Sequence, residues 1–86
     1  MNGGIRVLEI TPLFIRAICT YKGISLAELY KLLKLEQYFT LSYLYKVVQE
    51  IKPVTDNLNK VINDSINEVF TTRDIIKVLK LQECLK

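Results

Sequence analysis

Helix start and stop signals divide the first half of this chain into short segments. Thr11 precedes Pro12, the arrangement of an N-cap residue followed by proline at the first helical position, where the missing N–H costs nothing. Gly23 comes directly after the segment 12–22. Glycine commonly ends a helix by adopting the left-handed conformation. The spacing predicts a helix over 12–22. Its core face is expected to consist of Phe14, Ala17, Ile18 and Tyr21.

A capping box marks the start of a second helix. The hydroxyl oxygen of Ser25 can accept a hydrogen bond from the N–H of Glu28, while the Glu28 carboxylate reaches back to the N–H of Ser25. This helix is expected to begin at Ser25 and to end near Lys34. A connector follows over 35–39.

Thr40 is the N-cap expected for a third helix, which extends to about Lys52. Pro53 ends it, because the residue before a proline avoids helical geometry. One side of the helix is apolar and is expected to face a core, and it comprises Leu41, Leu44, Val47, Val48 and Ile51. The opposite side is polar.

The segment 54–71 supports two interpretations. As a helix capped by Thr55, it places its apolar residues on one stripe, namely Leu58, Val61, Ile62, Ile66, Val69 and Phe70. As a β-hairpin over about 57–71, it turns at 63–65, where Asn, Asp and Ser favour turns, and its Val, Ile and Phe residues favour strands. Periodicity alone favours the helix. Two features count against the hairpin: no glycine supplies a positive φ at the turn, and apolar and polar residues do not alternate strictly.

A final helix is predicted from Thr72 to about Leu85. Its apolar residues form one broad stripe, namely Ile75, Val78, Leu79, Leu81 and Leu85. A domain this small cannot easily cover such a stripe alone, so these residues are predicted to form the interface of a twofold homodimer. The alternative is that part of the stripe packs back on the helix over 12–22.

Composition limits the chemistry available to the chain. Half of its 86 residues are apolar and 24% are charged, the balance of a globular protein, and the length suits one domain over 1–86. There is no histidine, and the acidic residues show no spacing for acid–base catalysis. We therefore predict no enzyme activity, no metal site and no cofactor. Since no apolar run approaches the roughly 18 residues that cross a bilayer, a cytoplasmic protein without membrane contact is expected.

The three helices over 12–52 have the proportions of a helix-turn-helix unit. In DNA-binding examples, the last helix of such a unit places its polar face in the major groove. Short polar and basic side chains on that face can bond base edges or phosphates, and the candidates are Thr40, Ser42, Tyr43, Lys46 and Gln49. Ser25 joins them at a helix start, where backbone N–H groups favour phosphate. Tyr45 is instead expected to pack in a core or at an interface.

Short motifs in this region resemble those of winged helix-turn-helix regulators of the PadR and MarR type. The motifs are Thr11-Pro12-Leu13, Gly23-Ile24-Ser25-Leu26-Ala27-Glu28-Leu29 and Ser42-Tyr43-Leu44-Tyr45-Lys46. In PadR-like proteins a Leu-Tyr-Arg or Leu-Tyr-Lys triplet marks the recognition helix, and the last three residues of the third motif stand in that place. The resemblance covers about residues 11–52. It implies a hairpin wing over about 57–71, where Lys60 and Asn63 would approach DNA, and a dimerisation helix over 72–86.

On the strength of this resemblance, we expect a mainly α fold with a helix-turn-helix core and a short β-hairpin wing over 57–71. The alternative fold is an all-α bundle of four or five helices. The predicted function is sequence-specific or semi-specific binding of double-stranded DNA, with the helix over 40–52 in the major groove. The protein would be a dimeric transcriptional regulator, or a partition-type protein of a plasmid or virus, with a palindromic site. The alternative function is a small all-helical protein–protein interaction module.

Overall fold

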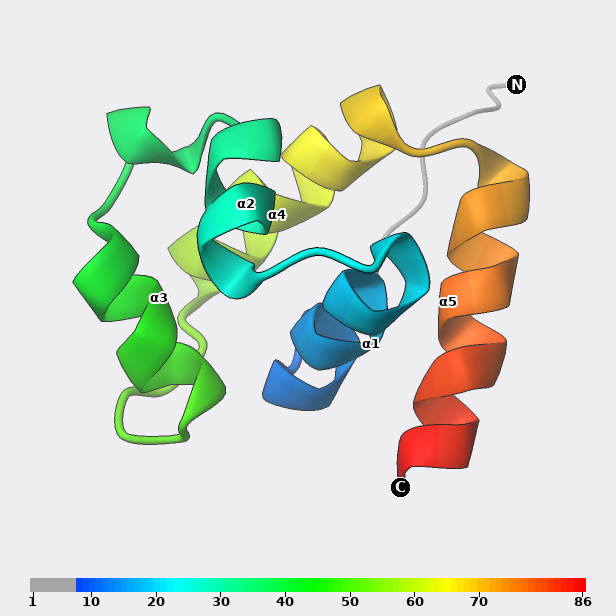
Figure 1. Ribbon diagram of the computed structural model, residues 1–86. Coiled ribbons are helices and arrows are strands. Elements are labelled where there is room, and N and C mark those ends of the chain that lie inside the picture. Colours follow the sequence, from blue (N-terminus) through cyan, green and yellow to red (C-terminus); the bar gives the residue numbers. More distant parts are fainter. Residues whose placement is uncertain (1–7) are drawn as a thin grey trace.

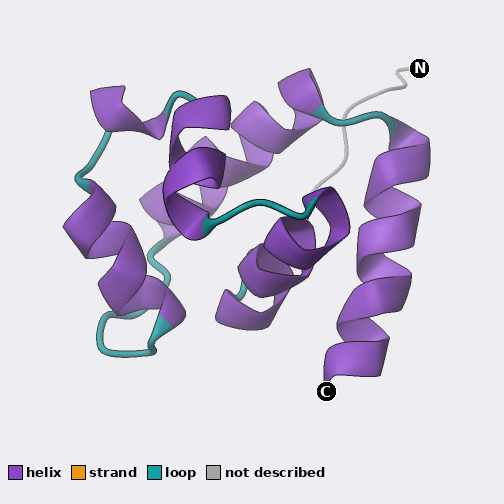
Figure 2. Cartoon of the chain, viewed as in Figure 1, coloured by secondary structure: helices purple, strands orange, loops and turns teal. Residues whose placement is uncertain are grey.

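The computed structural model describes residues 8–86, and within this range the chain forms helices and no strand (Figures 1 and 2). The α-helices are α1 (Pro12–Lys22), α2 (Leu26–Leu32), α3 (Leu41–Val48), α4 (Asp56–Val69) and α5 (Thr72–Leu85). A short 3₁₀ helix, η1 (Leu35–Gln37), lies between α2 and α3. The fold is therefore the all-α alternative with five α-helices, and no wing is present in the described part of the chain.

The predicted limits of α1 are confirmed, and local hydrogen bonds explain both. Thr11 is the N-cap, and its hydroxyl oxygen accepts a hydrogen bond from the N–H of Phe14 at 3.1 Å. Gly23 ends the helix in the left-handed region, with φ 66° and ψ 38°. The N–H groups of Gly23 and Ile24 then bond back to carbonyls of the last helical turn, at 3.2 and 3.0 Å.

The start of α2 is also confirmed. Its capping box is complete, since the Glu28 N–H donates to the Ser25 hydroxyl oxygen at 3.2 Å and the Ser25 N–H donates to the Glu28 carboxylate at 3.1 Å. The helix ends at Leu32 rather than near Lys34, because Lys34 adopts a left-handed conformation with φ 55°. That turn leads into η1 and brings Leu35 into the core.

The start of α3 follows the prediction, but its end does not. Thr40 is the N-cap, and its hydroxyl oxygen accepts a hydrogen bond from the Tyr43 N–H at 3.1 Å. The helix ends at Val48 instead of Lys52, because Glu50 takes a left-handed conformation with φ 64°. The helix therefore ends before Pro53, and the proline is not what ends it.

The predicted hairpin over 57–71 is wrong, because α4 occupies nearly all of this segment (Figure 2). Thr55 caps the helix, and its hydroxyl oxygen accepts a hydrogen bond from the Leu58 N–H at 3.1 Å. The buried side chains of α4 fall at helical spacing, namely Leu58, Ile62, Asn63 and Ile66. Strand geometry turns successive residues to opposite faces, so the adjacent residues Ile62 and Asn63 could not both be buried on one face of a strand. The segment also lacks the glycine that tight hairpin turns favour.

Helix α1 lies between α3 and α5 (Figure 1). Its buried residues are Phe14, Ile15, Ala17 and Ile18. The Arg16 guanidinium donates to the Val48 carbonyl at the end of α3, at 3.0 Å. The Tyr21 hydroxyl donates to the Asp74 carboxylate of α5, at 2.7 Å. At 3.6 residues per turn these two anchors lie about 140° apart around α1, so α3 and α5 pack on different sides of it.

The hydrogen bond between Tyr21 and Asp74 should make stability depend on pH at both ends of the scale. It holds the pKa of Asp74 below its ordinary value of 3.8 and raises the pKa of Tyr21 above its ordinary value of 10.0. A lowered carboxyl pKa stabilises the fold above pH 3.8, and this is lost as pH falls through the lowered value. A raised phenol pKa stabilises the fold below pH 10.0, and this is lost as pH rises through the raised value.

We therefore expect Tyr21→Phe to be less stable than the parent protein at neutral pH, with the difference shrinking at both extremes. Urea denaturation of the two proteins over a pH series measures this. A difference that stays constant from acid to alkali would show that the hydrogen bond does not form.

Candidate nucleic-acid interface

One side of α3 is turned to solvent, and we call it the outer face of α3. It consists of Ser42, Tyr45, Lys46 and Gln49, all of which are exposed. The other side of the helix is in the core, where Leu44 and Val47 are buried. Three of the predicted contact residues, Ser42, Lys46 and Gln49, therefore lie together on one accessible surface.

The two tyrosines of α3 have exchanged the roles expected for them. Tyr43 is partly buried, and its ring meets the edge of the Phe39 ring at 5.7 Å between centroids. Phe39 in turn packs against Tyr30, whose hydroxyl donates to the Phe39 carbonyl. Tyr45, expected to be a packing residue, is 42% exposed on the outer face of α3. Tyr45 thus replaces Tyr43 as the aromatic candidate for contact with DNA.

Thr40 and Ser25 are both exposed N-cap residues. The hydroxyl oxygen of each accepts a hydrogen bond from a backbone N–H of its own helix. At Ser25 the Glu28 carboxylate also occupies the serine N–H and places a negative charge where a phosphate would approach. Thr40 adjoins the outer face of α3, whereas Ser25 belongs to α2 and is the weaker candidate.

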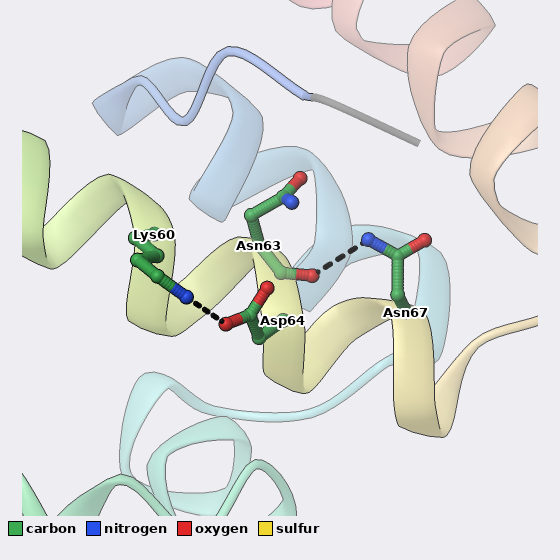
Figure 3. Close-up of polar contacts among 4 residues, drawn as sticks. All are labelled: Lys60, Asn63, Asp64 and Asn67. Atoms are coloured by element: carbon green, nitrogen blue, oxygen red, sulfur yellow. Dashed lines mark hydrogen bonds and ion pairs between the residues drawn. The ribbon is translucent and has the colours of Figure 1, made fainter. Parts of the chain in front are cut away.

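Lys60 and Asn63 lie on α4, so neither stands on a wing (Figure 3). Lys60 is exposed and forms an ion pair with Asp64 at 2.9 Å, and the hydrogen bond to that carboxylate raises the pKa of Lys60. Asn63 is only 8% exposed. Its side-chain oxygen accepts a hydrogen bond from the buried N–H of Leu8 at 2.8 Å. The prediction that Asn63 contacts DNA is therefore replaced by a structural role.

Asn59 and Asn63 together hold the segment 8–10 against α4. Asn59 accepts a hydrogen bond from the Ile10 N–H at 2.8 Å and donates to the Leu8 carbonyl at 3.3 Å. Sequence reasoning missed this role, although Asn59 and Asn63 share one helix face at i, i+4 spacing. The sequence did offer one signal for this role, because an amide side chain lies among the apolar residues of the α4 stripe.

The predicted dimer residues divide between the core and the surface. Ile75 and Val78 are buried within the chain, on the helix that packs against α1, so they are not available to a second copy. Leu81 is partly exposed, whereas Leu79 and Leu85 are exposed by 42% and 41%. The homodimer remains a prediction, with these last three residues as its accessible apolar side chains.

Residues 8–86 also bear on metal binding, membrane insertion and thiol chemistry. No group of three or more His, Cys, Asp or Glu side chains in that range could hold a metal ion, and no helix there is long and apolar enough to span a membrane. Cys19 and Cys84 are free. Burial raises the pKa of the Cys19 thiol, which lowers its thiolate fraction and hence its reactivity as a nucleophile. Cys19 packs against the core.

Comparisons with protein-family models, with curated proteins and with solved structures found no match to this chain. The resemblance to winged regulators stays a hypothesis, and its wing is absent from the described residues.

Proposed function

We propose that this chain binds double-stranded DNA through the outer face of α3. The observation that supports this proposal is the division of α3 into a buried apolar side and an exposed side bearing Ser42, Lys46 and Gln49. No side-chain hydrogen bond or ion pair to another described residue occupies these three groups. They are therefore free to bond a ligand without breaking an internal contact.

The dimensions and chemistry of this face suit the major groove. The groove is about 12 Å wide and admits one α-helix. Gln49 has the amide that can bond both N6 and N7 of an adenine, and Lys46 can donate to a guanine or a phosphate. Ser42 can bond either kind of base, and Tyr45 can stack on a sugar or donate its hydroxyl to a phosphate. The role would be transcriptional regulation or plasmid or virus partition.

The position of α3 is fixed by the rest of the fold. Its inner side chains Leu44 and Val47 are buried in the core, and Arg16 holds its last turn through the Val48 carbonyl. A contact helix that is rigid before binding loses less conformational entropy on binding. In this proposal, packing against the core holds the contact helix in position, and no wing is required.

We expect the double variant Lys46→Ala, Gln49→Ala to bind a duplex about tenfold more weakly, since it removes a cation and a hydrogen-bonding group worth roughly 1.4 kcal/mol together. Fluorescence anisotropy with a labelled duplex over a salt series measures the affinity. The loss of one phosphate contact should also reduce the slope of log affinity against log salt by about 1.

The matched control is Lys31→Ala, Gln37→Ala, which removes the same residue types from exposed positions on α2 and η1. Far-UV circular dichroism checks that both variants stay helical. If the control weakens binding as much as the α3 variant, binding follows total charge and the outer face of α3 is not the contact surface.

A second candidate is a protein–protein interaction module, and a groove favours it. The groove lies between the end of α2 and α4, with a volume of about 540 Å³. Its apolar lining includes Leu32, Tyr38, Val61 and Val69, and charged residues of both signs surround these. Such a lining suits an amphipathic helix from a partner. A parent protein that binds no duplex at any salt concentration would leave this candidate as the better one.

A further inference from the structure

A row of three cations lies on α5, and we call it the basic stripe of α5. It consists of Arg73, Lys77 and Lys80, which recur at i, i+4 and i+7 and therefore share one side of the helix. All three are exposed, and none forms an ion pair with another described residue. Since the whole chain has a net charge of only +3, this stripe is a strong local concentration of positive charge.

The acidic residues of α5 form no ion pair with the stripe. The Asp74 carboxylate accepts hydrogen bonds from the Tyr21 hydroxyl of α1 and from the Thr71 N–H of its own capping box. Glu83, at the other end of the helix, pairs with Lys86 at 2.9 Å. Both carboxylates are thus bonded to other groups, which leaves the three cations to a ligand.

The basic stripe of α5 and the outer face of α3 are turned in different directions. Both helices pack on α1, and α1 lies between them in Figure 1. Each helix buries its apolar side, which includes Val47 of α3 and Val78 of α5. The exposed sides therefore point away from α1 on different sides of the molecule. One straight duplex seated on α3 would leave the stripe of α5 free.

We propose that the basic stripe of α5 contacts the phosphate backbone of a second duplex, so that one molecule holds two DNA segments together. This inference rests on the proposed function of α3. The three Cα atoms span about 10 Å along α5, and a duplex strand presents about three phosphates over that length of its axis. Long, flexible cationic side chains can therefore meet successive phosphates without reading sequence.

The stripe fits nucleic acid better than a lipid surface. An amphipathic helix that lies on a membrane buries a broad apolar face in the lipid. In α5 the broad apolar face is already used against α1, where Ile75 and Val78 are buried. Three large apolar side chains of α5 remain exposed, namely Ile76, Leu79 and Leu85, on the same helix as the three cations.

A bridging assay tests the inference. One duplex is fixed to beads, a second carries a fluorophore, and the protein is added before the fluorescence held on the beads is measured. We expect Arg73→Gln, Lys77→Gln, Lys80→Gln to lower the captured fluorescence about tenfold or more, because three phosphate contacts are lost. Its affinity for a single duplex should change less than about threefold, because α3 still binds. Sedimentation equilibrium should give the parent subunit number, which excludes loss of a dimer as the cause.

The matched control is Lys31→Gln, Lys34→Gln, Lys52→Gln, which removes three exposed lysines from α2 and from the segments that follow α2 and α3. It should bridge as the parent protein does. The inference is overturned if the α5 variant bridges normally, if the control loses bridging equally, or if the parent protein binds one duplex and never two. It is also overturned if the α5 variant loses binding only to vesicles of phosphatidylcholine and phosphatidylserine.

The two proposals fail in different ways. If Lys46→Ala, Gln49→Ala leaves single-duplex affinity unchanged while the α5 variant loses it, the proposed function of α3 is wrong and α5 is the DNA surface. If the α3 variant weakens single-duplex binding and the α5 variant changes neither assay, α3 stands and the second surface does not exist.

Discussion

Replacing Asp64 by proline should lower the free energy of unfolding by about 3 kcal/mol or more. Asp64 lies inside α4, well away from either end of the helix. Proline there removes a backbone N–H that the helix needs and places its ring against the preceding turn. In the hairpin that the sequence suggested, the same residue would sit in the turn at 63–65, where proline at a type I position fixes a favourable φ. The substitution therefore separates the two folds of this segment.

The control for this substitution is Asp64→Ala. It removes the ion pair with Lys60, which is exposed on both sides and contributes little to stability. Alanine is also a better helix former than aspartate, so Asp64→Ala should leave the free energy of unfolding nearly unchanged. Urea denaturation followed by far-UV circular dichroism measures both variants. A proline variant as stable as the alanine variant would mean that α4 is not a continuous helix.

Local chemistry made the first part of the fold predictable. The N-caps Thr11, Ser25 and Thr40 each bond an N–H three residues later, and Gly23 bonds back to the last turn of α1. These contacts need no other part of the chain, so residue type and spacing were enough. The ends of α2 and α3 were less predictable, because Lys34 and Glu50 adopt left-handed conformations that non-glycine residues rarely take.

The error in α4 came from the resemblance to winged regulators and not from the local sequence pattern. Periodicity alone favoured a helix, and the resemblance to winged regulators turned the prediction towards a hairpin. Asn63, Asp64 and Ser65 are turn formers when they are free to bond their own backbone. Here the Asn63 side chain bonds Leu8, 55 residues away in the sequence. No local rule shows such a partner.

The candidate site on α3 could be predicted only in part, because its exposed side depends on residues outside the helix as well as on the local pattern. Leu44 and Val47 of the predicted apolar stripe are buried, whereas Ile51 lies beyond the end of α3 and is 63% exposed. Ser42, Lys46 and Gln49 follow as the exposed residues opposite the buried pair. The stripe does not show which tyrosine is exposed, because Tyr43 is partly buried through its contact with Phe39 and the core. An apolar stripe also does not reveal which element packs against it. The stripe of α5 was therefore assigned to a dimer interface, although α1 packs against α5 and the middle of that stripe is buried within the chain.

Replacing Asn63 by alanine should lower the free energy of unfolding by about 2 kcal/mol, because a buried N–H without a partner costs about 1–3 kcal/mol. The substitution would leave the Leu8 N–H without the oxygen that now lies 2.8 Å away. Leu8 itself is buried, so water does not readily replace the lost acceptor. Asn59 would keep its bonds to Leu8 and Ile10, which limits the loss to one end of the segment.

The control is Asn57→Ala, which removes an exposed asparagine from the same helix. Surface substitutions of this kind usually change the free energy of unfolding by less than about 0.5 kcal/mol. Equal stability of the two variants in urea denaturation would show that Asn63 does not hold the segment 8–10.

The same pair of variants also decides whether Asn63 takes part in binding. At a temperature where both variants are folded, a purely structural Asn63 predicts equal duplex affinities for Asn63→Ala and Asn57→Ala. A direct contact between Asn63 and the duplex would instead make Asn63→Ala the weaker binder, because the amide that reaches the duplex would be missing. Anisotropy titrations that give equal affinities, together with the loss of stability in urea, would assign Asn63 to the fold and not to a contact with DNA.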